Sequence, residues 1–371
     1  MTAATTERAV LIDRALSLPQ QPATGHNRWH PDIPPVLSVA PGDLVRLQTR
    51  DAADGQITPG CGVGVLDRLD AGRMHPLTGP VHVEGAAPGD LLEVEIVEVL
   101  PESYGFGIQY HSLGVLARHS PGPFLAHFDI ADGYATSAQI PGARFRGAPF
   151  MGVMGVAPDH GMLADSRAYE ERLGLSGAPP CMAQSCVPDD PAVARDGLRT
   201  IPPRANGGNL DIRQLTAGAS LFLPVFVDGA LFSAGDAHFA QGEGECVTGL
   251  EMAATLLCRF HLHKGRAAER GIRDPQFSFA RPGPAVPDGP RRFHATTGQS
   301  FARDGGLAHS DLRTAVENAL LNMVEHLMQT RGYDFQQAYL VCSLAADLRI
   351  SQAVNVPNFT ASVILDLSIF E

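Results

Sequence analysis

The stretches VLSVAPGDLVRLQT (residues 36–49) and VHVEGAAPGDLLEVEIVEVL (residues 81–100) decide the fold class. Each begins with an apolar run that alternates with polar residues, then has a Pro-Gly-Asp turn, then a second alternating run. A period of two puts successive side chains on opposite faces of a strand, and a turn between two such runs indicates a β-hairpin. Two such segments predict a β-sandwich or barrel built from short strands.

The pattern becomes helical toward the C-terminus. Residues 335–348 are an apolar segment that we expect to be helical, and residues 360–369 (TASVILDLSI) are a strand candidate. Residues 104–147 are rich in glycine and show few periodic runs, so they are expected to form long loops. In residues 311–331 the apolar side chains recur at spacings of three and four, which predicts one helical stripe: Leu312, Val316, Ala319, Leu320, Met323, Val324 and Leu327.

We therefore expect a mainly β protein with an α+β C-terminal part. The β-rich, sandwich-like domain with long loops would span residues 1–240. Residues 241–371 would form the smaller α/β subdomain packed on it.

Composition excludes several classes of function. The chain has 371 residues, 28 Lys and Arg, 40 Asp and Glu and a net charge of -12, with no basic stripe, which disfavours a nucleic-acid partner. No apolar stretch has the roughly 20 residues that a membrane span needs, and residues 1–14 lack an apolar secretory run. We expect a cytoplasmic protein whose six cysteines, none in a Cys-x-x-Cys pair, are free thiols.

Acidic, histidine and amide side chains that could take part in catalysis or metal binding are concentrated in two segments. Asp236 and His238 are two residues apart, so in an extended chain both point to one face, and Glu243 and Glu245 repeat that spacing after a glycine. Such nitrogen and oxygen atoms could bind a divalent metal. The alternative is a polar loop whose acids cap turns. The two segments are RANGGNLDIRQL (204–215) and SAGDAHFAQGEGEC (233–246).

Such a metal would allow hydrolytic chemistry, because water alone is a poor nucleophile. A bound cation polarises a carbonyl group and lowers the pKa of its water to about 7. A nearby carboxylate can then move a proton from that water to the leaving group.

Other sites are less well supported by the pattern. Asp51 and Asp54 in DAADGQ (51–56) resemble half a calcium loop, but the required Glu is missing and a turn is expected. There is no Gly-x-Ser-x-Gly elbow. Cys246 follows the acidic segment directly, so a cysteine nucleophile stays open as an alternative.

The sequence resembles the acetamidase/formamidase family over seven blocks in family order. The family usually reads Gln-Gly-Asp-Gly-Glu where this chain has Glu243 in place of the Asp. The blocks are GHNRWHPDIPPV (25–36), DAADGQI (51–57), GPVHVEGAAPGDLLEVEI (79–96), YATSAQIPGARF (134–145), PRANGGNLDI (203–212), SAGDAHFAQGEGE (233–245) and AYLVCSLAADLRISQAVNVPN (338–358).

The resemblance implies hydrolysis of short aliphatic amides, of the formamide and acetamide type, to a carboxylate and ammonia. It also implies a β-rich sandwich-like core with a smaller α/β part, a bound divalent metal and a homo-oligomer. Zinc is the first choice for that metal and calcium the second. The alternatives are a metal-free amidase using Cys246 or a carboxylate, or a non-catalytic β-domain protein that binds a small ligand.

The matching blocks supply the candidate site residues. Glu245 is expected to act as the general base, because it is the acid shared with the usual family pattern, and Glu243 is the second catalytic candidate. The remaining candidates are Asp211, Asp236 and His238 for the metal, and Asn209 and Gln241 for the substrate.

Overall fold

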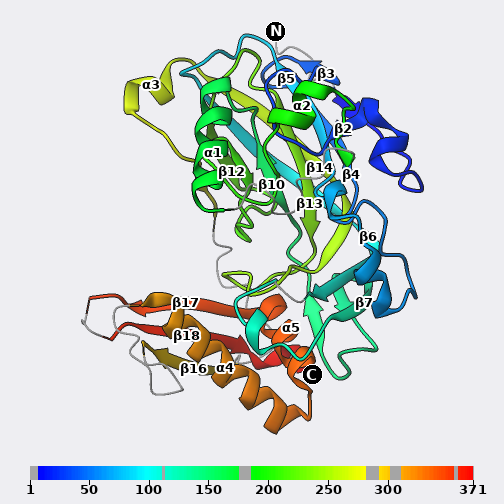
Figure 1. Ribbon diagram of the computed structural model, residues 1–371, viewed down its shortest axis with the longest axis vertical. Coiled ribbons are helices and arrows are strands. Elements are labelled where there is room, and N and C mark those ends of the chain that lie inside the picture. Colours follow the sequence, from blue (N-terminus) through cyan, green and yellow to red (C-terminus); the bar gives the residue numbers. More distant parts are fainter. Residues whose placement is uncertain are drawn as a thin grey trace.

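The computed structural model describes residues 7–110, 113–174, 185–280, 292–300, 311–354 and 358–370 of the chain (Figure 1). Within these residues the protein is mainly β, as expected, with a large sheet and a separate small sheet. In Figure 1 the large sheet fills the upper part of the molecule, and the small sheet lies below it with two helices.

The large sheet has a central path of strands in the order β11-β10-β13-β14-β6-β7-β8-β9. On this path the strands are β6 (Leu91–Gln109), β7 (Phe124–Ala131), β8 (Tyr134–Thr136), β9 (Arg144–Arg146), β10 (Phe150–Gly155), β11 (Gly207–Asn209), β13 (Phe232–His238) and β14 (Glu251–His263). The branches are β1 (Glu7–Val10), β2 (Gly25–His26), β3 (Leu37–Val39), β4 (Leu44–Thr49), β5 (Leu77–Val83), β12 (Ser220–Pro224) and β15 (Gln276–Ser278).

The Pro-Gly-Asp segments form strands as predicted, but the prediction of two hairpins is wrong. β3 pairs in parallel with β5, whereas β4 pairs with β1 and β14. β5 likewise pairs with β13, while β6 pairs with β14. At each turn the chain crosses to a different part of the sheet. The prediction failed because a local pattern specifies a strand and a turn but does not specify the strand's partner.

Residues 104–147 also differ from the expectation of long loops. They contain the end of β6 and the strands β7, β8 and β9, which pair in sequence as antiparallel neighbours. Glycines at 105 and 107 alternate with buried Phe106 and Ile108, so the apolar period exists on one face only.

The small sheet has the order β16-β18-β17, with β16 at Phe293–Gln299, β17 at Ala346–Gln352 and β18 at Thr360–Asp366. Helix α4, Leu312–Arg331, packs on β16 and β18 and confirms the periodic stripe. The Asp311 side chain caps its first turn, and Gly332 ends it in a left-handed conformation. Helix α5, Phe335–Ala345, is three residues shorter than expected, because β17 begins at Ala346.

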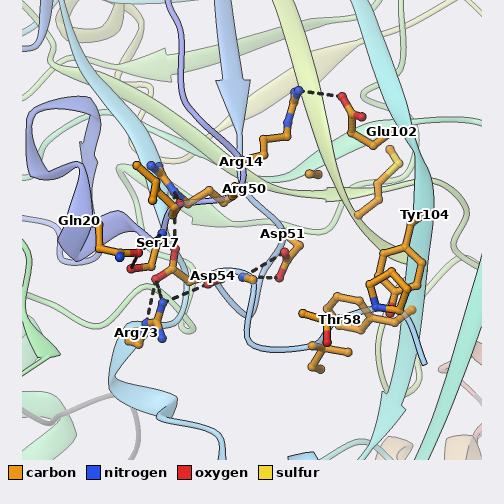
Figure 2. A pocket seen from close by; sticks show the side chains of 18 residues that line it. Arg14, Ser17, Gln20, Arg50, Asp51, Asp54, Thr58, Arg73, Glu102 and Tyr104 are labelled. Carbon is orange, nitrogen blue, oxygen red and sulfur yellow. Dashed lines mark hydrogen bonds and ion pairs between the residues drawn. The ribbon is translucent and has the colours of Figure 1, made fainter. Parts of the chain in front are cut away.

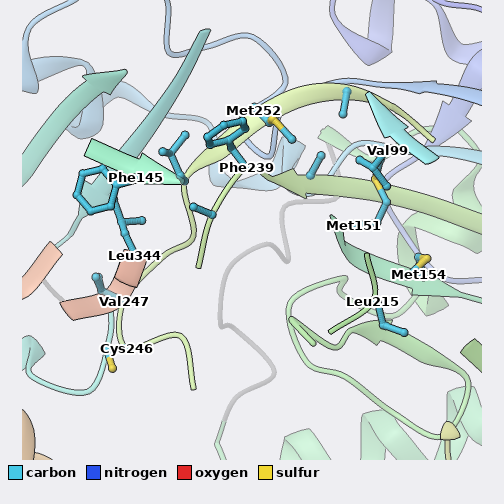
Figure 3. Packing of buried hydrophobic residues seen from close by; sticks show 14 of the residues in the cluster. Val99, Phe145, Met151, Met154, Leu215, Phe239, Cys246, Val247, Met252 and Leu344 are labelled. Atoms are coloured by element: carbon cyan, nitrogen blue, oxygen red, sulfur yellow. The ribbon is translucent and has the colours of Figure 1, made fainter. Parts of the chain in front are cut away.

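One buried apolar cluster joins the two sheets. Leu320 of α4 and Leu340 and Leu344 of α5 belong to the same cluster as the buried side chains of the large sheet. Figure 3 shows Leu344 among Phe145 and Val247. Strand β14 is hydrogen-bonded to β13, β4 and β6, so the large sheet continues well beyond residue 240.

Three further helices lie in the upper part of the molecule in Figure 1, where α1 and α2 lie over the large sheet and α3 lies at its side: α1 (His160–Arg172), α2 (Pro191–Asp196) and α3 (Arg266–Arg270). Among the helices that the structure describes, none is both long and apolar enough to cross a membrane.

Candidate active site

Three acids and a histidine meet because their strands are neighbours. Asp211 lies two residues after the end of β11, and its backbone N–H donates to the carbonyl oxygen of Gly152 in β10 at 3.2 Å. Asp236 and His238 lie in β13, which pairs with β10. Glu251 opens β14 and is the direct cross-strand partner of His238. The strand order β11-β10-β13-β14 therefore assembles residues that are far apart in sequence.

Gly152 leaves room between two of these acids. A Cβ atom at this position would lie 2.6 Å from Oδ1 of Asp211 and 2.8 Å from Oδ2 of Asp236. Both distances are shorter than van der Waals contact, so any side chain here would fill the space that the two carboxylates face. A glycine at this point keeps a small polar space open.

The site contains buried polar atoms without hydrogen-bond partners. They are Asp211 Oδ1, His238 Nε2 and Glu251 Oε2. His238 Nε2 lies 3.2 Å from Glu251 Oε2 and 3.6 Å from Asp236 Oδ1. Buried polar atoms are normally paired, so unpaired atoms that converge fit a missing electropositive partner.

Two overlapping groups of side chains have the geometry of a metal site. One is Asp211, His238 and Glu245; the other is Asp236, His238 and Glu251. In each group the ligand atoms lie within 4.8 Å of one another. Carboxylate oxygens and an imidazole nitrogen are the donor set that zinc accepts, and the oxygens alone suit calcium. The residues present therefore fit a divalent cation.

Electrostatics divides the acids into two kinds. Burial raises the pKa of Glu251 to about 8. Burial, with the nearby charge of Glu245, raises the pKa of Asp211 well above its usual value. Burial also works to raise the pKa of Asp236, but the charges of His75 and His238 outweigh it and lower that pKa.

For the imidazole of His238, burial and the neighbouring charges act on the pKa in opposite directions. Burial alone would lower the pKa of His238, but the carboxylates of Glu251 and Asp236 raise it well above its usual value. The group thus concentrates several charges in a place where water does not screen them. Bringing so many ionisable side chains together in a buried space is typical of a functional site.

The backbone of the site is held in unusual conformations. Asp211, Asp236 and Glu245 have φ values of 49°, 55° and 27°. Left-handed backbone is uncommon for residues other than glycine and clusters at functional sites.

The C-terminal part holds the loop that carries Gln241 and Glu245. The N–H of Gly242 donates to the carbonyl of Ser343 in α5 at 2.7 Å. The N–H of Leu348 in β17 donates to the carbonyl of Glu243 at 2.8 Å. The small sheet and its helices therefore help to build the site.

The other sequence candidates take different places. Gln241 Oε1 lies 2.7 Å from His238 Nδ1, and Gln241 Nε2 donates to the carbonyl of Asp211 at 2.9 Å. Asn209 lies at the end of β11, and its buried Oδ1 has no partner. The Glu243 side chain is 42% exposed and points to Arg349, at 3.6 Å, which places it outside both metal-type groups.

Sequence reasoning missed Glu251. It stands at the start of an apolar strand with no polar motif around it, so only its register opposite His238 reveals it. His75 was also missed. Its Nδ1 is buried without a partner, and its charge acts on Asp236.

The segment DAADGQ forms a turn, as the sequence predicted. The Asp51 carboxylate accepts from the backbone N–H groups of Ala53 and Gly55. Asp54 pairs with Arg73 at 2.5 Å and accepts from the Leu18 N–H. Both acids line a cavity of about 470 Å³, and its lining contains none of the five clustered site residues. Figure 2 shows the two acids on the cavity wall.

A third group consists of the buried His30 and two exposed residues, Asp32 and His160. Nδ1 of His30 accepts the backbone N–H of Asp32 at 3.1 Å. This contact makes His30 a hydrogen-bonded structural histidine.

Cys246 is unsuited to act as a nucleophile. It is buried, and burial with the charge of Glu245 raises the pKa of its thiol to about 12. The thiolate is the nucleophilic form of cysteine, and it would be scarce at neutral pH. The other described cysteines, at 61, 186, 258 and 342, are free thiols, whereas Cys181 lies outside the described residues.

Fold and site together define a β-rich protein with a buried carboxylate–imidazole centre of the kind that can hold a metal ion, and comparison with known proteins narrows that class. Residues 11–371 match the model of the acetamidase/formamidase family. The acetamidase of Mycolicibacterium smegmatis is 34% identical over 89% of this chain and 87% of its own length. The formamidase of Methylophilus methylotrophus is 34% identical over 93% of this chain and 89% of its own length.

Solved structures of related enzymes have the same fold as this chain. The γ-lactamase from Delftia acidovorans superposes with a TM-score of 0.91 at 33% identity, covering 99% of this chain and 94% of that one. An acetamidase from Bacillus halodurans superposes with a TM-score of 0.55 at 27% identity, covering 94% of this chain and 96% of its own. The chain belongs to the acetamidase/formamidase family and is an amidohydrolase that acts on linear amide C–N bonds.

Proposed function

We propose that this protein hydrolyses short aliphatic amides to a carboxylate and ammonia with the help of a bound divalent cation, zinc in the first instance. The observation that carries the proposal is the pair His238 Nε2 and Glu251 Oε2. The two atoms are buried, lie 3.2 Å apart, and have no hydrogen-bond partner. A proton or a metal cation between two such electron-pair donors would satisfy both, and together with Asp236 they form a donor set that a divalent cation fits.

Asp236, His238 and Glu251 would hold the cation, because their ligand atoms are all buried and within 4.8 Å of one another. The cation would polarise the amide carbonyl and lower the pKa of water at the site. Glu251 replaces Asp211 in the ligand set expected from the sequence.

Asp211 and Glu245 would then carry out the proton transfers of the reaction. Burial and the charge of Glu245 raise the pKa of Asp211, so the Asp211 carboxyl favours its protonated form beside Glu245. Such a pair can accept a proton at Glu245 from the attacking water and return it to the leaving nitrogen. Asn209, whose buried Oδ1 has no hydrogen-bond partner, would accept from the amide N–H₂.

The likeness to the γ-lactamase, with its TM-score of 0.91, favours a second substrate class. A cyclic amide has the same C–N bond to cleave, so the same residues would serve. The leaving nitrogen would then stay attached to the product as an amine.

The test is ammonia release from formamide, acetamide and propionamide, with 2-pyrrolidinone ring opening measured alongside by chromatography. Purified protein is assayed as isolated, after chelation, and after zinc or calcium is restored. We expect chelation to abolish activity and zinc to restore it. Full turnover by protein shown to contain no metal would refute the metal-dependent mechanism, and inactivity toward the whole panel would refute the substrate class.

A further inference from the structure

The amide side chain of Gln241 lies between His238 and the backbone of Asp211. Its Oε1 is 2.7 Å from Nδ1 of His238, and its Nε2 donates to the backbone carbonyl of Asp211 at 2.9 Å. The residue is 6% exposed. Both ends of the amide therefore have partners within the protein.

The Asp211 carbonyl decides which way round this amide lies. A carbonyl oxygen can only accept a hydrogen bond, so the atom of Gln241 that faces it must be the nitrogen. The reversed amide would bring two acceptor oxygens to about the same 2.9 Å separation. The oxygen Oε1 must then face His238.

The orientation of the amide in turn fixes the imidazole. Because Oε1 can only accept, Nδ1 of His238 must carry the hydrogen of that 2.7 Å bond. In the neutral ring the free electron pair is then on Nε2, which is the nitrogen that faces Asp236 and Glu251. A hydrogen bond to one ring nitrogen commonly sets which nitrogen is available to a metal.

The ring cannot easily turn over to escape this arrangement. The Phe150 ring meets it edge-on, with centroids 5.2 Å apart and planes at 82°. On another side Gly249 lies so close that a Cβ there would be 2.4 Å from Nδ1. In this position Nδ1 faces Gln241, and Nε2 faces the carboxylates of Asp236 and Glu251.

We infer that Gln241 is a positioning residue that fixes the Nδ1–H form of His238 and ties it to the Asp211 backbone, instead of binding substrate. The metal-binding consequence rests on the proposed function, whereas the hydrogen position on the ring does not. Gln241 would act through His238 and would not touch the amide substrate.

Two substitutions separate the two contacts. Gln241→Met has a similar length and removes both hydrogen bonds. Gln241→Glu keeps an acceptor for Nδ1–H but cannot donate to the Asp211 carbonyl. Gln56→Met is the matched control, since Gln56 also bridges two backbone positions, at Ala53 and Asp70, away from the site.

The main measurement is ¹⁵N–¹H spectroscopy on protein with labelled histidines, with and without zinc. His238 signals are identified by their loss in His238→Gln. In the unsubstituted protein we expect a slowly exchanging Nδ1–H proton in both states and a zinc-bound Nε2 in the loaded state. Gln241→Met should lose the protected Nδ1–H proton, Gln241→Glu should keep it, and Gln56→Met should leave it unchanged.

Zinc affinity, measured by competition with a chromogenic chelator, is the second measurement. Gln241→Met should weaken zinc binding by about 10- to 100-fold, the range for partners that orient a ligand histidine. An unchanged Nδ1–H signal in Gln241→Met, or hydrogen only on Nε2 in the unsubstituted protein, would overturn the inference. If the unsubstituted protein binds no zinc, the metal part of the proposed function fails, while the Nδ1–H signal still decides the role of Gln241.

Discussion

The hydroxyl of Ser343 joins helix α5 to the backbone at Val247. Its oxygen accepts the Val247 N–H at 2.9 Å and donates its own hydrogen to the Thr248 carbonyl at 2.9 Å. Ser343 is fully buried. One small side chain thus satisfies two backbone groups in the loop between Glu245 and Glu251.

We expect Ser343→Ala to loosen this loop. Two buried backbone groups would lose their partner, which should lower the free energy of unfolding by about 1–3 kcal/mol. Turnover should fall as well, because Glu245 and Glu251 flank the loop. Urea unfolding and amide hydrolysis measure the two effects. Ser351→Ala, at an exposed position in β17, is the control and should change neither.

Gly152→Ala tests the space between Asp211 and Asp236. The added Cβ would lie 2.6 Å and 2.8 Å from their carboxylate oxygens, so both side chains or the strand must move. We expect zinc content and turnover to fall at least tenfold, with a stability loss of about 1–3 kcal/mol from overpacking.

The control for that substitution is Gly62→Ala. A Cβ at Gly62 would meet nothing within 4 Å, and its φ of -81° suits alanine. Metal analysis, activity and thermal unfolding are compared for the two variants. Normal zinc content and turnover in Gly152→Ala would show that the space is not part of the site.

Glu245→Gln tests the proton transfer. The change preserves shape and removes the charge, so turnover should fall by about 100- to 10,000-fold, the range for a lost acid–base group, while zinc is retained. Loss of zinc together with activity would instead make Glu245 a ligand. Glu243→Gln should have little effect, because that side chain faces Arg349 at the surface. A large loss there would return Glu243 to the catalytic group.

The buried His26 should make the free energy of unfolding depend on pH. Its Nδ1 lies 2.6 Å from the Arg28 carbonyl and its Nε2 2.7 Å from the Ser233 hydroxyl, so the neutral ring fits both partners. Burial lowers the pKa of His26 from 6.5 to about 4.

The sign follows from proton binding. Between pH 6.5 and 4 the unfolded chain gains a proton at His26 and the folded chain does not, so stability falls as pH falls. The full effect is about 3 kcal/mol, since one pKa unit corresponds to about 1.4 kcal/mol. Urea unfolding at several pH values measures it. His26→Gln should have a flatter profile between pH 6.5 and 4, and an equal slope in both proteins would contradict the assignment.

Local sequence predicted the elements better than their pairing. The stripe in residues 311–331 identified α4 because a helix buries a face that its own residues specify. The Pro-Gly-Asp turns, in contrast, looked like hairpins, although β4 and β6 both find their partner in β14. Partner choice depends on contacts between residues that lie more than 140 positions apart in the chain, and no local period encodes such contacts.

The same limit applies to the site. Asp236 and His238 could be grouped from sequence because they share one strand, β13. Glu251 could not, because it reaches His238 only through the register of β13 against β14. The pairing of Gln241 with His238, three residues apart, depends on a loop held by α5.

The positive φ values of Asp211, Asp236 and Glu245 have a consequence for how this enzyme can change. Left-handed backbone at such residues costs on the order of 1–3 kcal/mol each, and glycine would relieve most of it. Selection for heat resistance alone would therefore favour replacing these acids with glycine. The selected variants would be more stable to heat but inactive. Any programme of thermostabilisation should hold these three positions constant and seek its gains elsewhere in the chain.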